Sequence, residues 1–483
     1  MATRDRRTPR IEKGDIVKAT AFTTHRRRLL LLLALLIGVG LALVPAARAA
    51  EPVLPGDLIW RATLSFSGVY DDDGSVAVQL DPWGNAIVAG NAYTAPGQLN
   101  IEWHSYARPT SVGVSPHWRW GSYWNGSANG RDTAVGLVVN GAGESYIAGT
   151  TASSGHGSDY VLLRISAAGV LDWARVYDGP VHKADEASAV ALDGAGNIYV
   201  TGASIGKKGN RDIVTLKYTP AGALLWVKRF NSPWNSYDRG TSVTVRGGSV
   251  YVAGVSRHPG HGDDITLIMY TTAGVRQWVR FYDDSLHRSE MVSRIAAAPG
   301  VVCVAGEGKF GPILSGDALL IKYTSGGARK WTKYLGGSSG LDDAWSDVAV
   351  DAAGRVHVTG FAYGKTTGDN AVTAVYSAGG ALRWKRAFSS PGNHLDIGEA
   401  LALDAAGTTY VAASSENNSN KVDVVALAYD AAGGRLWATR FDGVAHGDDY
   451  AADVVVDSSD YVWVVGQSET THRLDMLTAL FAK

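Results

Sequence analysis

A tryptophan recurs along the chain at an almost constant interval, and this repeat limits the folds that the chain can adopt. After a first interval of 60 residues, the spacings are 53, 53, 52, 53, 53 and 53 residues. A large apolar residue stands four positions after every one of these tryptophans. The eight positions are Trp60, Trp120, Trp173, Trp226, Trp278, Trp331, Trp384 and Trp437. A fixed period of about 50 residues predicts that one structural unit is repeated eight times.

One unit has the pattern of four short strands. Residues 189–192, 198–201, 212–218 and 223–230 are apolar or alternating segments. The turns between them, at 193–197 and 219–222, contain Asp, Gly, Asn and Pro, which suit tight hairpins. Short strands joined by hairpin signals at a regular spacing predict an all-β repeat.

The size of the unit and the two ends of the array predict a closed ring. A four-stranded sheet of about 50 residues is one blade of a β-propeller. Such a sheet must pack against neighbours on both faces, so we expect each repeat tryptophan to pack between blades. The array ends at 474–481, which matches a third strand, whereas 58–64 supplies a Trp strand before the first inner strand. We therefore predict an eight-bladed β-propeller over residues 50–483, with the N-terminal strand completing the last blade. Seven blades are the alternative, because the first unit is irregular.

Residues 1–49 have the pattern of a secretory signal peptide. Three arginines at 26–28 precede sixteen apolar residues, Leu29 to Val44, and Ala47-Arg48-Ala49 fits a cleavage site. We expect cleavage near Ala49 and a secreted, periplasmic or cell-surface location. The alternative is a retained anchor, although sixteen apolar residues fall short of the roughly 20 that span a bilayer. No later segment predicts a membrane span.

The charge and the single cysteine restrict the possible partners. Without residues 1–49, which hold ten Lys/Arg and three Asp/Glu, the chain has 35 basic and 43 acidic residues. This acidic balance does not favour phosphate backbones, so we expect no nucleic-acid partner. Cys303 lies in an apolar run, which predicts a buried side chain rather than a disulfide or a reactive thiol.

An acidic residue stands at the start of the first strand in every unit. These residues are Asp73, Asp132, Asp185, Asp238, Glu290, Asp343, Asp396 and Asp449. We expect this acidic ring to surround one mouth of the central channel. A second acidic series begins the third strand, on the same face: Asp159, Asp212, Asp264, Asp317, Asp369 (shifted by one), Asp423 and Asp475.

The acidic ring has two interpretations, a cation-binding face and a set of turn caps. Aspartates often accept backbone N–H bonds in loops, and repetition in every unit favours caps. His182, His287 and His446 stand three residues before a ring carboxylate, and His394 stands two before one. Histidine and aspartate could ligate Zn²⁺. Because such a histidine occurs in only half of the units, we predict no metal site, no cofactor and no catalytic residue.

The repeat resembles a known family. Its phrases VAVD-x-x-G-N-x-Y-V-T-G, D-x-x-x-x-K-Y and G-x-x-x-W are similar to the SBBP (seven-bladed β-propeller) repeats of exported bacterial proteins. The resemblance covers residues 58–483. It implies a propeller scaffold and no particular activity, and the eight units here depart from the family's name.

Two functions remain open from the sequence. The first is an exported, monomeric, non-enzymatic scaffold that binds a protein or carbohydrate. The alternative is a PQQ-dependent dehydrogenase-like periplasmic enzyme, because YTPAGALLW is similar to the repeat of those proteins. They typically carry two adjacent cysteines, whereas this chain has one. The irregular segment 93–120 is either a place where function has been added or a degraded terminal repeat.

Overall fold

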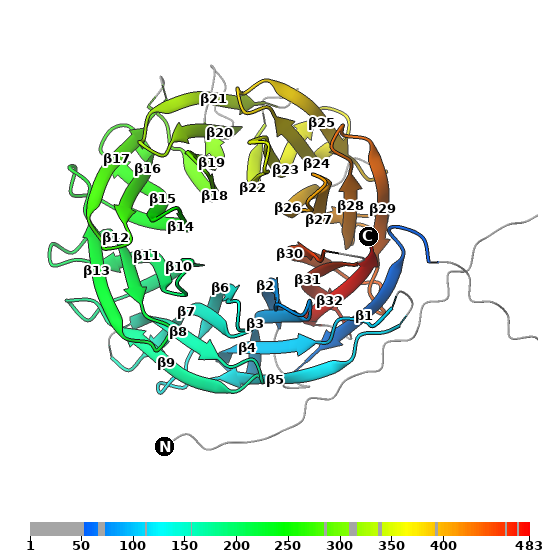
Figure 1. Cartoon of the computed structure of the whole chain (residues 1–483), viewed down its shortest axis with the longest axis horizontal. Helices are drawn as coiled ribbons and strands as arrows, with labels where there is room; N and C mark the ends of the chain where they lie inside the picture. Colours follow the sequence, from blue (N-terminus) through cyan, green and yellow to red (C-terminus); the bar gives the residue numbers. More distant parts are fainter. Residues whose placement is uncertain are drawn as a thin grey trace, which may run out of the picture.

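The computed structural model describes residues 53–65, 73–111, 114–155, 157–284, 287–308, 316–336, 341–391, 395–458, 461–470 and 473–483. The predicted signal peptide at 1–49 and His394 lie outside these residues. Within the described parts, 32 strands form eight four-stranded sheets arranged in a ring (Figure 1). No helix in these parts is long and apolar enough to cross a membrane.

We number the sheets as blades 1 to 8 in chain order, with strands given from the inside of the ring outward. Blade 1 is β2 (Gly74–Leu80), β3 (Ala86–Ala95), β4 (Gln98–Tyr106) and β5 (Trp118–Trp124); blade 2 is β6 (Thr133–Val139), β7 (Ser145–Ser153), β8 (Gly157–Ile165) and β9 (Leu171–Tyr177). Blade 3 is β10 (Asp185–Leu192), β11 (Ile198–Ile205), β12 (Arg211–Tyr218) and β13 (Leu224–Phe230); blade 4 is β14 (Asp238–Arg246), β15 (Ser249–His258), β16 (Gly262–Thr271) and β17 (Arg276–Tyr282). Blade 5 is β18 (Met291–Ala298), β19 (Val301–Gly308), β20 (Asp317–Thr324) and β21 (Arg329–Leu335); blade 6 is β22 (Ala344–Val350), β23 (Val356–Gly364), β24 (Gly368–Tyr376) and β25 (Leu382–Phe388). Blade 7 is β26 (Asp396–Leu403), β27 (Thr409–Glu416), β28 (Val422–Tyr429) and β29 (Arg435–Phe441); blade 8 is β30 (Asp449–Val456), β31 (Tyr461–Glu469), β32 (Leu474–Ala482) and β1 (Leu58–Leu64).

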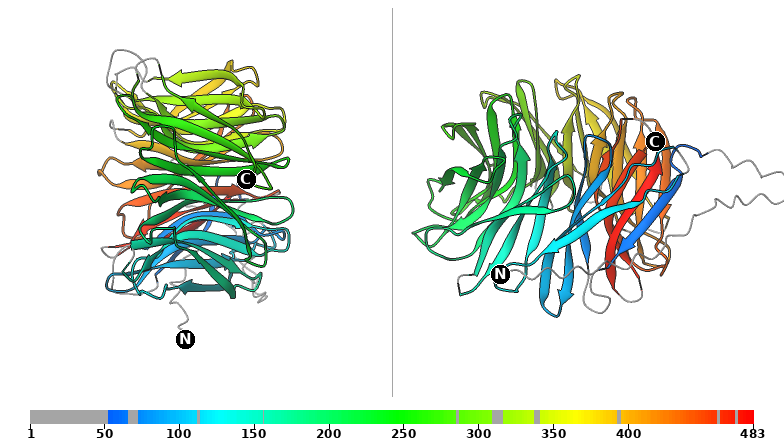
Figure 2. Two further views of the ribbon diagram at one scale, coloured as in Figure 1. Left: turned by 90° about the vertical axis from the view of Figure 1, so that its left-hand side faces the viewer. Right: turned by 60° about the horizontal axis from the view of Figure 1, so that its bottom comes forward.

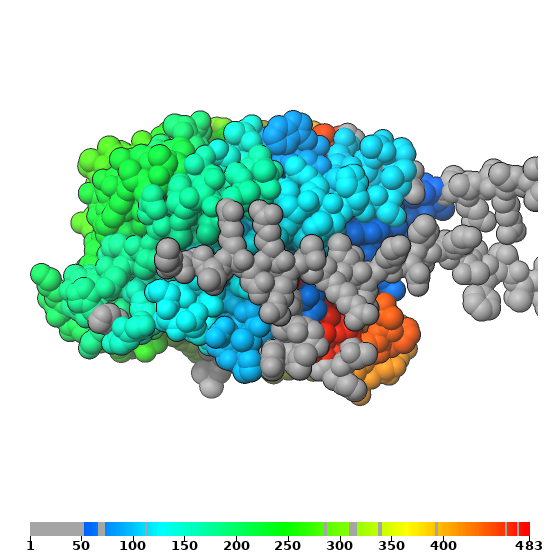
Figure 3. All heavy atoms as spheres, turned by 90° about the horizontal axis from the view of Figure 1, so that it is seen from below, coloured from blue at the N-terminus to red at the C-terminus, as the bar shows by residue number. Residues whose placement is uncertain are grey.

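The ring closes through the two ends of the repeat array. Strand β1 pairs antiparallel with β32, from Leu58 opposite Phe481 to Leu64 opposite Met476. The blue strand β1 therefore lies beside the red strand β32 (Figure 1), and blue and red segments adjoin on the side of the ring that Figure 3 shows. The predicted eight-bladed, all-β architecture with N-terminal closure is confirmed, and the seven-blade alternative is wrong.

Seen from the side, the strands of each blade run between the two faces of the ring (Figure 2). The two middle strands of a blade are buried almost throughout, as in β11 and β12, because neighbouring sheets cover both of their faces. The first strand of blade 3 begins at Asp185 rather than at residue 189. Its pairing with β11 continues past a bulge between Ala187 and Ala189, so both strands are longer than the sequence indicates.

Side chains near the bulges of the inner strands bond to the backbone of the next blade. Asp453 accepts the N–H of Val78 (2.9 Å), and Asp347 accepts the N–H of Leu401 (3.0 Å). These bonds join inner strands that share no sheet. They therefore add directional contacts to the apolar packing between blades.

The repeat tryptophans pack between blades, as predicted. Trp331 and Trp384 donate their indole N–H to the carbonyls of Ala378 (3.2 Å) and Ala431 (3.3 Å) in the next blade. The turn glycine beneath Trp384, Gly433, has a positive φ of 86°, and a Cβ there would lie 2.6 Å from the indole. Trp384 is buried, whereas the other seven are only half-buried at the rim.

The irregular first unit is a complete blade with a longer outer turn. Its strands are regular, and the extra residues lie between β4 and β5 at 107–117. Arg108 in this turn reaches across the closure of the ring. Its Nε lies 2.7 Å from a carboxylate oxygen of Asp457 in blade 8, and its guanidinium lies over the ring of Tyr461. The insertion thus adds a contact where the ring closes.

Cys303 is completely buried in β19. Burial raises the pKa of its thiol to about 12, so it behaves as a small apolar side chain, as predicted.

The blade contacts predict a stability effect for the buried indole. Trp384→Ala should lower the free energy of unfolding by about 3 kcal/mol, because it removes a packed side chain between two sheets. Trp83→Ala, at an exposed turn, is the control and should cost about 1 kcal/mol or less. Urea unfolding of both variants measures the difference, and equal losses would contradict an inter-blade role for Trp384.

Candidate functional site

The acidic ring is buried and does not line an open mouth. All eight carboxylate residues are at most 1% exposed. Six of them accept a hydrogen bond from the backbone N–H of the residue six positions earlier, in the loop that enters the blade. The donors are Gly126 (2.6 Å), Gly179 (2.5 Å), Ser232 (2.8 Å), Asp284 (3.2 Å), Ser390 (2.8 Å) and Gly443 (2.6 Å). These contacts agree with the turn-cap interpretation, and the ring carboxylates at the starts of the inner strands are buried rather than open to solvent.

The strand beside each ring carboxylate supplies a second donor in several blades. The hydroxyls of Thr151 and Ser415 donate to Asp132 (2.6 Å) and Asp396 (2.5 Å). Asp73 and Asp343 lack a hydroxyl neighbour there and accept the backbone N–H of Tyr93 and Tyr363 instead, at 2.7 Å each.

The two acidic series meet across the junctions between blades. A second-series carboxylate lies close to the ring carboxylate of the following blade. At three junctions a third carboxylate, directly after the outer strand, joins them, and one oxygen of each lies within 4.8 Å of the others. These triads are Asp159, Asp178 and Asp185; Asp264, Asp283 and Glu290; and Asp423, Asp442 and Asp449. Asp369 stands one residue out of register, and Asn370 takes its buried place.

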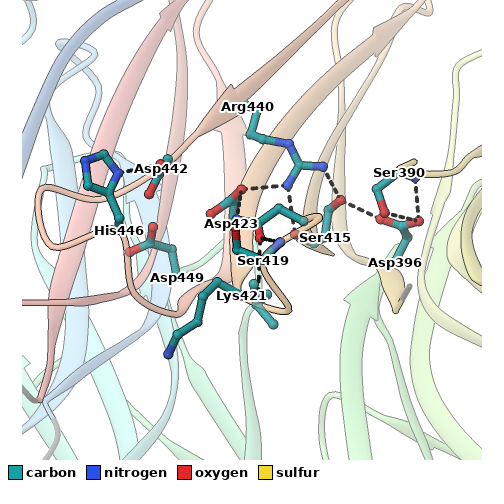
Figure 4. Close-up of polar contacts among 12 residues, drawn as sticks. Ser390, Asp396, Ser415, Ser419, Lys421, Asp423, Arg440, Asp442, His446 and Asp449 are labelled. Carbon is teal, nitrogen blue, oxygen red and sulfur yellow. Dashed lines mark hydrogen bonds and ion pairs between the residues drawn. The ribbon is translucent and has the colours of Figure 1, made fainter. Parts of the chain in front are cut away.

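The described histidines beside the ring carboxylates hold a loop conformation. His182, His287 and His446 have positive φ angles of 51°, 53° and 50°. The Nδ1 of each bonds to the aspartate four residues earlier, as His446 does to Asp442 (2.7 Å, Figure 4). Asn129 and Asn235 make the same loop contact at two other junctions, to Asn125 and Asn231. These histidines therefore bond to the preceding aspartate and not to the ring carboxylate, which corrects their interpretation from the sequence.

An arginine neutralises the second acidic series in two blades. Arg440 bonds to Asp423 (2.7 Å) and to the hydroxyl of Ser415, which itself donates to Asp396 (Figure 4). Arg229 bonds to Asp212 (2.9 Å) and Ser204 in the same way. These chains of polar contacts connect the carboxylates of one junction with those of the next.

Burial raises the free energy of the ionised ring carboxylates, because it removes them from water. It raises the pKa values of Asp132, Asp185, Asp238 and Asp396 above their usual range. It raises the pKa of Asp449 to about 6 and that of Glu290 to about 9. The acidic face is therefore built from desolvated carboxyl groups rather than from solvated ones.

Sequence reasoning missed two histidines that approach one of the triads. His258 and His261 lie beside Asp264 and Asp283. A local signal was present, since 258–264 contains the spacing His-x-x-His-x-x-Asp. The spacing does not recur in the other units, so the repeat pattern does not reveal it.

A second missed feature lies on the opposite face, at the turns that follow the inner strands. Trp83, Asn85, Arg119 and Trp120, with Ala167 and Ala168, line an open hollow of about 630 Å³. Trp83 is 59% exposed. Four other blades have alanine at the same turn position, Ala142, Ala195, Ala353 and Ala406.

Comparisons with known proteins give distant structural similarities and no family. No protein-family model and no curated protein matches the chain. Among solved structures it is similar to a periplasmic gluconolactonase of Pseudomonas aeruginosa (14% identity, TM-score 0.41, 70% of this chain and 95% of that one). It is also similar to the β-propeller domain of the Trilobed protease of Pyrococcus furiosus (10%, 0.42, 72% and 92%) and to a puromycin hydrolase (13%, 0.43, 71% and 51%). Likeness at this level concerns the fold and transfers no activity.

The buried carboxylates predict a pH-dependent stability. The pKa of Asp449 is about 6 in the folded chain and about 3.9 in an unfolded one. Its protonation therefore stabilises the fold fully below about pH 4, and this contribution is lost as the pH rises through 6. Asp449→Asn cannot ionise, so it should be more stable than the wild type by about 3 kcal/mol at pH 8 and about equally stable at pH 4. Urea unfolding at both pH values measures this, and a variant less stable than the wild type at pH 8 would contradict it.

Proposed function

We propose that the mature chain is an exported, monomeric, non-enzymatic scaffold that binds carbohydrate through the hollow around Trp83. The proposal rests on one observation. Blade 1 has an exposed tryptophan, Trp83, at a turn position where four other blades have alanine. The propeller needs only a compact turn at this position, because alanine occupies it in four other blades. The indole of Trp83 lies against the turn of blade 2 at Gly143, yet the residue stays 59% exposed.

The side chains of the hollow suit a sugar. Aromatic rings present flat apolar faces to the C–H groups of a sugar ring, and Trp83 and Trp120 supply two of them. Arg119 is fixed by hydrogen bonds to Asp81 (3.1 Å) and Ser105 (3.0 Å). Asn85 is fixed by a bond to Asp81 (2.7 Å). Such pre-positioned polar groups can bond to hydroxyls without a large loss of side-chain entropy.

The acidic face supports a scaffold rather than a catalyst. Most of its ring carboxylates accept a backbone N–H through one oxygen, which gives them a structural role in the loops. The quinoprotein alternative is weaker, because the single cysteine is buried within β19. Export rests on the signal-peptide pattern of residues 1–49, and the resemblance to SBBP repeats stays a prediction.

The proposal predicts glycan binding that depends on one side chain. On a glycan array, the mature chain should bind a defined set of sugars, and Trp83→Ala should weaken that binding about 10-fold or more. Leu436→Ala, at an exposed outer-strand position, is the control and should bind as the wild type does. Calorimetry with the best sugar gives the affinities. Absence of binding by the wild type, or unchanged binding by Trp83→Ala, would contradict the proposal.

A further inference from the structure

The junction between blades 4 and 5 gathers titratable side chains from several separate segments. His258 ends β15, His261 lies in the loop after it, and Asp264 lies in β16. Asp283 and Glu290 flank the loop that enters blade 5. Ligand atoms of His258, His261 and Asp283 lie within 4.8 Å of one another, as do those of Asp264, Asp283 and Glu290. The two groups share Asp283, so they form one cluster.

Among the described residues, this cluster lacks the arginine that pairs with the second-series aspartate in blades 3 and 7. Arg229 and Arg440 stand three residues after a repeat tryptophan and pair with the second-series aspartates of their blades. The corresponding residue in blade 4 is Phe281. No guanidinium therefore takes the place beside Asp264 that Arg440 takes beside Asp423.

Two buried carboxylates of the cluster have an oxygen without a hydrogen-bond donor. Asp264 is 1% exposed and Glu290 is fully buried. Within the described residues, Asp264 Oδ1 and Glu290 Oε2 have no hydrogen-bond partner. A buried, unsatisfied carboxylate oxygen is costly, and a cation is the partner that would satisfy it.

The histidines lie at distances that ligands of one metal ion would have. His261 Nδ1 lies 3.1 Å from Asp283 Oδ2, and His258 Nδ1 lies 3.4 Å from Asp264 Oδ2. Ligands about 2.0–2.1 Å from a tetrahedral ion are separated by about 3.3 Å. The ring of His258 is itself held in place between Trp234 (4.1 Å between centroids) and His261 (4.0 Å).

We propose that this junction binds one divalent transition-metal ion of the Zn²⁺ type, with His258, His261, Asp264 and Asp283 as ligands. Two imidazoles with two carboxylates are a donor set that Zn²⁺ prefers, whereas Ca²⁺ and Mg²⁺ prefer oxygen donors alone. Glu290 lies next to Asp264 and Asp283 and is not needed as a ligand. The site is on the opposite face from the Trp83 hollow and does not depend on sugar binding.

His287 is the neighbouring histidine that the proposal leaves out. Its Nδ1 bonds to Asp283 Oδ2 (2.6 Å), which is the loop contact that His446 and Asn235 make at other junctions. Asparagine can replace histidine in this contact. His287→Asn should therefore keep the loop and the metal affinity.

The test uses the mature chain, stripped of metal with a chelator and titrated with Zn²⁺ by calorimetry. The wild type should bind one equivalent, with a rise in melting temperature. His258→Gln and His261→Gln should each weaken binding on the order of 100-fold, because each removes a ligand. His287→Asn and His446→Asn are the matched controls and should bind as the wild type does.

A second measurement separates ligand loss from misfolding. The metal-free variants should have the wild-type circular dichroism spectrum and melting temperature, and Co²⁺ in the wild type should give the intense visible absorption of a four-coordinate site. Failure of the wild type to bind Zn²⁺, tighter binding of Ca²⁺ than of Zn²⁺, or unchanged affinity in both glutamine variants would overturn the proposal. Loss of affinity in His446→Asn would also overturn it, by placing the ion at another junction.

Discussion

The structure depends on the inability of a single four-stranded blade to bury both of its faces. The middle strands are buried on both sides, so every sheet needs two neighbours, and only a closed ring gives two neighbours to all eight. The apolar clusters accordingly lie between sheets, as one does between β15 of blade 4 and β18 of blade 5. The indole-to-carbonyl bonds at the rim and the aspartate-to-backbone bonds near the axis fix how each blade lies on the next.

The loops that join the blades are held by buried charge, and this explains why one face of the molecule is so acidic. At six of the eight inner strands, a carboxylate at the start of the strand accepts a backbone N–H of the preceding loop. The free energy of desolvating these groups opposes that gain. Arg440 offsets it at one junction, whereas the junction that contains Glu290 has imidazoles instead. Local differences in this balance, rather than the repeated carboxylates themselves, mark the candidate site.

Most of the architecture could be predicted from the sequence, because it follows from positions that recur in every unit. The register of the tryptophans gave the blade number, and the unmatched third strand at 474–481 gave the closure. Burial of the acidic ring could not be predicted, since strand pairing past a bulge adds residues such as Asp185 to the strand. The proposed sites could not be predicted from the repeat, because their residues do not recur. Trp83, His258 and His261 each stand in one unit and have no counterpart in the others. The fold brings Trp83 beside Arg119, and it brings the two histidines beside Asp283.

The pairing of β1 with β32 also bears on how the chain reaches its folded state. The partners Leu64 and Met476 are more than 400 positions apart, and the backbone of Gly56 bonds to that of Ala482. Contacts of such long range form late, after much loop-closure entropy has been lost. A chain emerging N-terminus first would keep an unsatisfied strand edge until its final residues appear. During that interval it would be a natural client for chaperones and vulnerable to proteolysis.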